Sequence, residues 1–174
     1  MLTQKLLNKC HLKGDFLLSD GKTHATEYYD LSPVFMSYFG LRLLCNMINQ
    51  KLENIAYEHV ACYELCPVPL VGAYCHSNIN VTGLIVRKKN KGHGTDRVIE
   101  GQYKVGDKVV LLEDVTATGQ SVMRAIEILQ GNGLRVAGVL TIINRQEGCD
   151  QLLWNHNFMW LYTKSELEEF EKRG

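Results

Sequence analysis

Two adjacent acids followed by a short run of hydroxyl and glycine residues are the part of this sequence best suited to chemistry. The acids, Glu113 and Asp114, stand at the end of an apolar run that begins at Val109. The next residues are mostly small or polar and lead into a segment with helical spacing: Thr116, Ala117, Thr118, Gly119, Gln120 and Ser121. In such a loop, backbone N–H groups, hydroxyls and the positive end of a helix converge on a phosphate. We predict that it binds a 5′-phosphate.

The paired acids need a partner other than the phosphate, which they would repel. The 2′- and 3′-hydroxyls of a ribose can donate hydrogen bonds to Glu113 and Asp114, and a nearby magnesium ion would also suit carboxylates. The alternative is an ordinary strand–turn–helix in which Asp and Thr residues only cap the helix. The first interpretation predicts a sugar phosphate as the ligand.

A second candidate is the basic segment of residues 87–95, which follows the apolar run Val81–Val86. Five of its nine residues can carry positive charge, and glycines flank His93, which makes the segment mobile. Taken alone, such a run is often only solvated surface. If the bound sugar phosphate loses an anionic leaving group, however, that group needs cations, and a closing loop would also exclude water.

The pattern of apolar runs indicates how these loops are held. Short β-branched runs alternate with segments of helical spacing, which predicts an α/β fold with a mainly parallel central sheet flanked by helices. The expected central strands are His59–Tyr63, Val81–Val86, Val109–Glu113 and Arg135–Ile143. With 174 residues, of which 45% are hydrophobic, residues 1–174 fit a single domain.

Three helices are expected from their start and stop residues. Ser32-Pro33 opens the first, and the apolar residues that recur in it every four positions, and so should pack in the core, are Phe35, Phe39, Leu43 and Met47. The second starts near Gly119 and stops at residues 131–133, Gly-Asn-Gly. The third should begin at residues 163–166, Thr-Lys-Ser-Glu, which have capping-box spacing.

The N-terminal part has a different pattern. Residues 16–18, Phe-Leu-Leu, and the pair Tyr28-Tyr29 lie on either side of the turn-rich stretch 19–22, Ser-Asp-Gly-Lys. This pattern predicts a small antiparallel flap that could cover a site on the main sheet.

Composition excludes several classes of protein. Lysine plus arginine equals aspartate plus glutamate at 19 each, so no overall field favours nucleic acid or an anionic membrane surface. The apolar runs are shorter than the roughly 20 residues of a membrane span, and the start lacks the apolar core of a signal peptide, so we expect a cytoplasmic protein. The six cysteines should be reduced, and the spacing of Cys62, Cys66 and Cys75 does not fit a zinc site.

Two motifs carry a resemblance to a known family. The run from Val109 to Ser121 resembles the motif with which type I phosphoribosyltransferases bind 5-phosphoribosyl pyrophosphate (PRPP). The basic segment resembles the catalytic loop of orotate phosphoribosyltransferases, and the matching residues are Arg87, Lys88, Lys91, His93 and Gly94. This resemblance implies that the catalytic residues are Lys91, His93, Lys88 and Arg87 of the loop, which face the leaving pyrophosphate, and Asp114, which faces the ribose. It also implies a homodimer in which the loop tip reaches the neighbouring subunit's active site.

The resemblance also indicates where the base would bind. Arg145, just past the last expected central strand, matches the arginine that binds orotate, although Asn144 stands where the family has an acid. The N-terminal flap resembles the family's hood, which we take to be formed largely by residues 1–30 with a contribution from the C-terminus. Its candidate substrate contacts are Ser19, Lys22, Tyr28 and Tyr29. A departure is Cys66-Pro67, where the family has a small Gly/Thr/Ala-rich loop and where Pro67 lacks an N–H donor.

The resemblance implies transfer of the 5-phosphoribosyl group from PRPP to orotate, which gives orotidine 5′-monophosphate and pyrophosphate in pyrimidine nucleotide biosynthesis. Magnesium would be bound mainly through PRPP, with no dedicated metal ligands in the chain. Alternatives are a phosphoribosyltransferase for a different base, a non-catalytic PRPP-binding regulatory homologue, and a generic phosphate-binding α/β domain.

Overall fold

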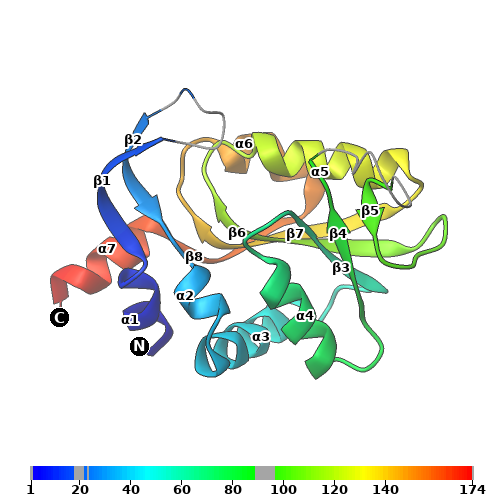
Figure 1. The fold of residues 1–174 in the computed structure, drawn as a ribbon, viewed down its shortest axis with the longest axis horizontal. Helices are drawn as coiled ribbons and strands as arrows, with labels where there is room; N and C mark the ends of the chain where they lie inside the picture. The colour runs from blue at the N-terminus through cyan, green and yellow to red at the C-terminus, as the bar shows by residue number, and fades with distance from the viewer. Residues whose placement is uncertain (1, 18–21, 23, 89–96, 174) are drawn as a thin grey trace.

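The structure is a computed structural model that describes residues 2–17, 22, 24–88 and 97–173. In these residues, six strands form a central sheet with the order β5-β4-β3-β6-β7-β8, and two further strands form a separate antiparallel pair (Figure 1). The six are β3 (His59–Tyr63), β4 (Thr82–Val86), β5 (Ile99–Glu100), β6 (Lys108–Thr116), β7 (Arg135–Asn144) and β8 (Phe158–Thr163). All neighbours pair in parallel except β4 and β5. The expected mainly parallel sheet is confirmed.

Two hydrophobic cores explain why the central strands are apolar throughout. In β3, Val60 and Cys62 face one core, whereas Ala61 and Tyr63 face the other. Helices α3 (Tyr38–Leu52) and α4 (Val68–Ser77) cover the first face, and α5 (Gln120–Gly131) and α6 (Cys149–Leu153) cover the second, as Figure 1 shows. A strand buried on both faces has no polar side, so the uninterrupted apolar runs are accounted for.

The expected first helix is divided in two, which corrects the prediction of its buried face. A short helix, α2 (Ser32–Phe35), ends before α3, and the Ser37 hydroxyl caps α3 by accepting a hydrogen bond from the Gly40 N–H at 3.0 Å. Because α3 is a separate helix, the four-residue repeat that begins in α2 does not continue onto the buried side of α3. Phe39 is therefore 69% exposed, and the buried side of α3 consists of Gly40, Leu44, Cys45, Ile48 and Leu52.

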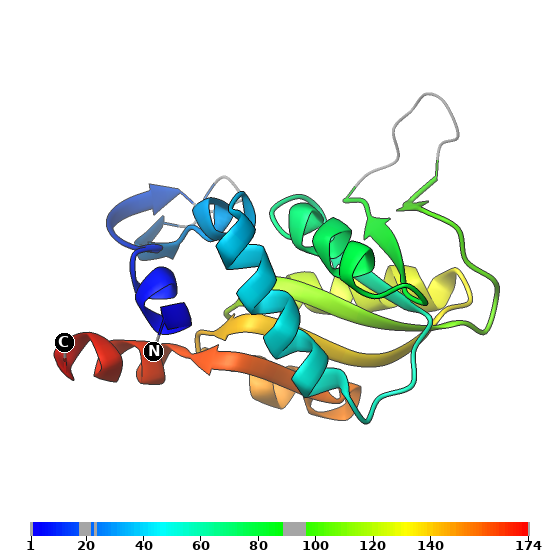
Figure 2. The ribbon, with the colours of Figure 1, turned by 90° about the horizontal axis from the view of Figure 1, so that it is seen from below.

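The N-terminal and C-terminal segments meet at one end of the sheet. Strands β1 (His11–Leu17) and β2 (His24–Tyr29) form the expected antiparallel pair, which follows helix α1 (Leu2–Asn8). The carboxyl end of β8 leads directly into α7 (Lys164–Arg173) beside α1 (Figure 2). The Asn8 side chain donates a hydrogen bond to the Leu167 carbonyl at 3.2 Å, so the two ends of the chain are tied together. No helix within the described residues is both long enough and apolar enough to span a bilayer.

Candidate active site

The predicted phosphate loop lies between the carboxyl end of β6 and the first turn of α5. Gly119 precedes the helix with φ 83°, a left-handed conformation that glycine adopts without strain. No side chain caps this helix start, so the N–H groups of its first turn are not used by a capping side chain. The Arg145 N–H donates to the Thr116 carbonyl at 2.9 Å, which ties the loop to the end of β7. The local geometry is therefore compatible with an anion at this helix start.

The two acids differ in their surroundings. Glu113 is only 8% exposed, and its Oε2 has no hydrogen-bond partner among the described residues. Asp114 is half-buried and accepts a hydrogen bond from the Val115 N–H at 2.8 Å. Burial, and then the negative charge of Asp114, raise the pKa of Glu113 well above its usual value, while Lys88 opposes the rise. Buried Thr116 Oγ1 also lacks a partner in this part of the chain, so the site has unused polar atoms for a ligand.

A change at Glu113 should stabilise the protein, because a buried carboxylate without a donor is costly. The raised pKa means that Glu113 contributes stability below its usual pKa of about 4.3, and that this contribution is lost as pH rises through the raised value. Glu113→Gln should therefore increase the free energy of unfolding at pH 8 by about 1–3 kcal/mol, or roughly 3–9 °C in Tm, and by less at pH 5. Thermal unfolding at both pH values measures this. An equal gain at both would show that the charge of Glu113 is not the cause.

Only the first residues of the basic segment are described. Arg87 pairs with Glu64 at 3.9 Å and with Glu100 at 3.7 Å. Lys88 lies with its Nζ 5.7 Å from the centre of the Tyr63 ring, and its charge acts on Glu113. Arg87 thus ties neighbouring elements together, whereas Lys88 lies near the acids. Lys91 and His93 lie outside the described residues.

The loop that contains Cys66-Pro67, whose sequence differs from the family pattern, follows β3 and lies close to the acids. The Cys66 thiol contacts the Asp114 carboxylate, and burial together with that carboxylate raises the pKa of the thiol. The thiol therefore stays protonated, which does not suit a nucleophile. Pro67 precedes α4, and the Glu64–Leu65 peptide bond is cis. The sequence marked Cys66 as a departure from the family pattern but did not indicate its contact with Asp114.

The predicted hood residues fall on two sides of β2. Tyr28 is 43% exposed and lies near Asp114 and Cys66. Burial, and then the negative charge of Asp114, raise the pKa of Tyr28. A cavity of about 440 Å³ lies here, with Tyr28 and Cys66 in its lining. Neighbouring side chains of a strand point to opposite faces, so Tyr29 lies on the other side of β2 from Tyr28. Tyr29 is buried there and stacks on His11 with ring centres 4.5 Å apart. Lys22 is exposed, and Ser19 lies outside the described residues.

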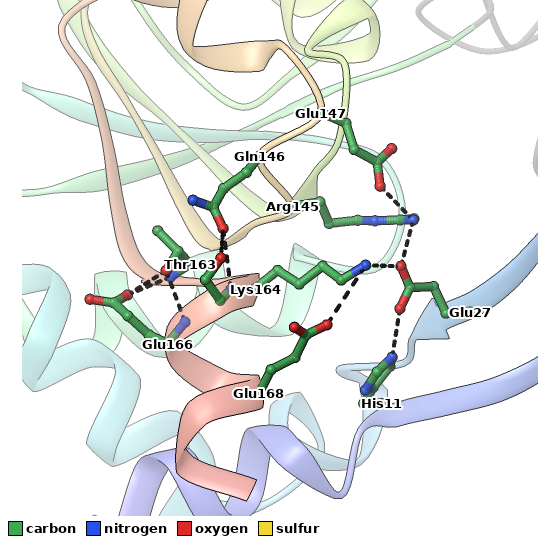
Figure 3. Close-up of polar contacts among 10 residues, drawn as sticks. His11, Glu27, Arg145, Gln146, Glu147, Thr163, Lys164, Glu166 and Glu168 are labelled. Carbon is green, nitrogen blue, oxygen red and sulfur yellow. Dashed lines mark hydrogen bonds and ion pairs between the residues drawn. The ribbon is translucent and has the colours of Figure 1, made fainter. Parts of the chain in front are cut away.

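Arg145 lies near the hood, but it is already paired (Figure 3). Its Nη2 atom is 2.7 Å from Glu147 Oε1 and 3.5 Å from Glu27 Oε1. Glu27 in turn contacts His11 and Lys164. The sequence motif identified Arg145 but none of these partners.

Asn144, which stands where the family has an acid, organises the turn after β7. It is 1% exposed, and its Oδ1 accepts a hydrogen bond from the Gln146 N–H at 2.7 Å. Its Nδ2 donates to Asp150 at 2.8 Å. An amide can donate and accept at once, which a carboxylate cannot do, so Asn144 suits this structural position.

Comparison with known proteins identifies the family. No protein-family model matches the chain. The chain is 39% identical over 176 residues to the orotate phosphoribosyltransferase of Pyrococcus horikoshii, covering 99% of this chain and 94% of that protein. It is 39% identical over 171 residues to the corresponding enzyme of Pyrococcus furiosus, covering 97% and 93%.

Solved structures agree with this result. The crystal structure of orotate phosphoribosyltransferase from Aeropyrum pernix matches with a TM-score of 0.79 and 26% identity, covering 100% of this chain and 99% of that one. The fold, the placement of the acids near the carboxyl end of β6 and these relatives lead to one conclusion. The chain belongs to the orotate phosphoribosyltransferase family.

Proposed function

We propose that the protein transfers the 5-phosphoribosyl group of PRPP to orotate, forming orotidine 5′-monophosphate and pyrophosphate in pyrimidine nucleotide biosynthesis. The observation that carries this proposal is the pair Glu113 and Asp114 beside an uncapped helix start, with a buried Glu113 oxygen that lacks a donor. A ribose diol supplies the missing donors, and the helix start takes the 5′-phosphate. A generic phosphate site has no use for two acids at this position.

The arrangement suggests how the chain's residues divide the reaction. The 5′-phosphate lies on residues 116–121, and the ribose hydroxyls face Glu113 and Asp114. As a ring nitrogen of orotate bonds to C1 and loses its proton, the bond from C1 to pyrophosphate breaks and its electron pair leaves with pyrophosphate, which can also accept that proton. Positive charge develops on the ribose in between. Asp114 stabilises that charge, while Lys88, Lys91 and His93 neutralise the departing pyrophosphate.

The acids also fit magnesium that is held mainly by PRPP. Carboxylate oxygens are ligands that Mg²⁺ prefers, and half-buried Asp114 would be the residue of this chain that contributes one. The described residues contain no group of three or more His, Cys, Asp or Glu able to hold a metal ion by themselves. When bound, the ion would offset the negative charge of the leaving group.

We further propose a cytoplasmic homodimer with shared active sites. Four apolar side chains in the segment after α2, the first turn of α3 and the turn after β3 are strongly exposed, namely Met36 at 76%, Tyr38 at 69%, Phe39 at 69% and Leu65 at 77%. Met36 and Leu65 line the same cavity, and the rings of Tyr38 and Phe39 are 5.4 Å apart. Soluble monomers rarely expose such groups together, and a second copy of the chain would cover them.

The substrate assignment is tested with purified protein, PRPP and magnesium against orotate, uracil, adenine, guanine and hypoxanthine. Turnover with orotate, and at least about 10²-fold lower kcat/KM with uracil, is expected because uracil lacks the carboxylate that Arg145 would pair with. Turnover with a purine and none with orotate would contradict it. Calorimetric binding of PRPP without turnover of any base would instead favour a regulatory protein.

A further inference from the structure

Glu27 is the centre of a charge cluster that joins the hood to the main sheet (Figure 3). Its Oε2 lies 3.0 Å from His11 Nε2. Its Oε1 contacts Lys164 Nζ and, more distantly, Arg145 Nη2 at 3.5 Å. The side chains of Glu27 and Arg145 are only 19% and 13% exposed, so these contacts are shielded from solvent.

The acids of the cluster already balance the positive charge of Arg145, so none of that charge is left over for a substrate. Arg145 and Lys164 are the permanent cations, and they face three carboxylates: Glu27, Glu147 and Glu168. A base that carries a carboxylate can pair with Arg145 only if one of the acids that contact Arg145 moves away from it. The contact with Glu147 is 2.7 Å, whereas that with Glu27 is 3.5 Å, so Glu27 is the weaker of the two partners of Arg145.

Arg145 also has an unused donor for such an exchange. Its Nε is buried and has no hydrogen-bond partner in the part of the chain that the structure describes. A carboxylate that approaches the guanidinium from the side binds Nε and one terminal nitrogen together. Replacing the long contact with Glu27 by such a paired contact would satisfy both nitrogens.

We propose that Glu27 pairs with Arg145 when the base site is empty. When the base binds, its carboxylate replaces Glu27 on Arg145, and Glu27 stays paired with Lys164. The inference rests on the proposed function, because it takes Arg145 as the residue that binds orotate. Lys164 is a positioning residue in this scheme: it acts on the base site by holding Glu27. Without Lys164, Glu27 would keep only His11 as a partner and no permanent cation whenever Arg145 turned to the substrate.

Two features of the surroundings support the role of Lys164. The hydrogen bond from Lys164 is the main cause that lowers the pKa of Glu27, ahead of His11, and Arg145 contributes least, so Glu27 stays ionised after losing Arg145. Lys164 is also held in place, because it opens α7 inside the capping box formed by Thr163 and Glu166. Gln146, next to Arg145, accepts a hydrogen bond from the Ser165 hydroxyl at 2.6 Å, so the two cations are fixed relative to each other.

A double-mutant cycle on Glu27 and Lys164 tests the proposal. Lys164→Met should raise the KM for orotate about tenfold and leave the KM for PRPP within about twofold, because Glu27 then keeps Arg145 as its main partner. Glu27→Gln should lower the KM for orotate or leave it unchanged. The KM of the double variant for orotate should equal that of Glu27→Gln alone. Glu169→Gln is the matched control on α7, since that acid pairs only with Arg173 among the described residues, and it should behave as the unmodified protein.

The outcomes separate this inference from the proposed function. If the unmodified protein turns over orotate but Lys164→Met and the double variant share one raised KM, the exchange is wrong. A KM raised by Glu27→Gln itself would also overturn it, because Glu27 would then be only a support for Arg145. An unmodified protein that neither binds nor turns over orotate would overturn both. Unchanged circular dichroism and an unchanged KM for PRPP show that each variant is folded.

Discussion

Replacing Asp114 with asparagine is expected to lower kcat by about 10²–10³-fold, because the substitution removes a negative charge from the place where the ribose becomes positive. The fold should tolerate it. The carboxylate oxygen of Asp114 that accepts from the Val115 N–H at 2.8 Å has an amide counterpart in asparagine. The thiol of Cys66 can likewise donate to an amide oxygen. The effect should therefore appear in kcat and not in the melting temperature, and steady-state kinetics with PRPP and orotate measures it.

A matched substitution at the other end of the same strand provides the control. Asp107 precedes β6, and its carboxylate lies 2.9 Å from His59, which lowers the pKa of the acid. Asp107→Asn removes the same charge far from the phosphate loop and should leave kcat within about twofold. If Asp114→Asn were equally mild, the acids would not face the ribose, and the proposed reaction would lose its main support.

The parts of the fold that the sequence predicted are those with an uninterrupted local pattern. The expected central strands are unbroken apolar runs, and their cores on both faces require that pattern. Strand β5 has two residues and exists only through its pairing with β4, so no local pattern indicates it. Helix α4 contains Pro69 and Gly72 among apolar residues and has no clear polar face, so its periodicity was not visible.

The candidate site also has parts that a local sequence pattern predicts and parts that it does not. The acids and the phosphate loop are contiguous in the chain, so their spacing alone predicts a phosphate and a ribose. The partners of Arg145 are not contiguous with it: Glu27 lies 118 residues away, and Lys164 comes from a different element. Only the three-dimensional arrangement brings the hood, the end of β7 and α7 together. The exposure of Phe39 similarly depends on the break between α2 and α3, which a four-residue repeat does not reveal.

Mixing two inactive variants should restore activity if the catalytic loop acts across a dimer. Lys91→Ala removes a cation for the leaving group, and Asp114→Asn removes the acid at the ribose, so each variant alone should be nearly inactive. In a mixed dimer with shared sites, one site receives the intact Asp114 of one subunit and the intact Lys91 of the other. Random exchange makes half of the dimers mixed, with one working site each, so about a quarter of the normal activity should return.

The pattern of recovery, and not its size alone, decides between a shared and a private site. If each loop served its own subunit, every site in the mixture would keep one defect, and no activity would return even when native mass spectrometry shows mixed dimers. Lys91→Ala mixed with His93→Ala is the matched control, because both defects lie in the same loop and no assortment of subunits produces an intact one. Recovery in the first mixture but not in the second therefore requires that Lys91 and Asp114 come from different subunits.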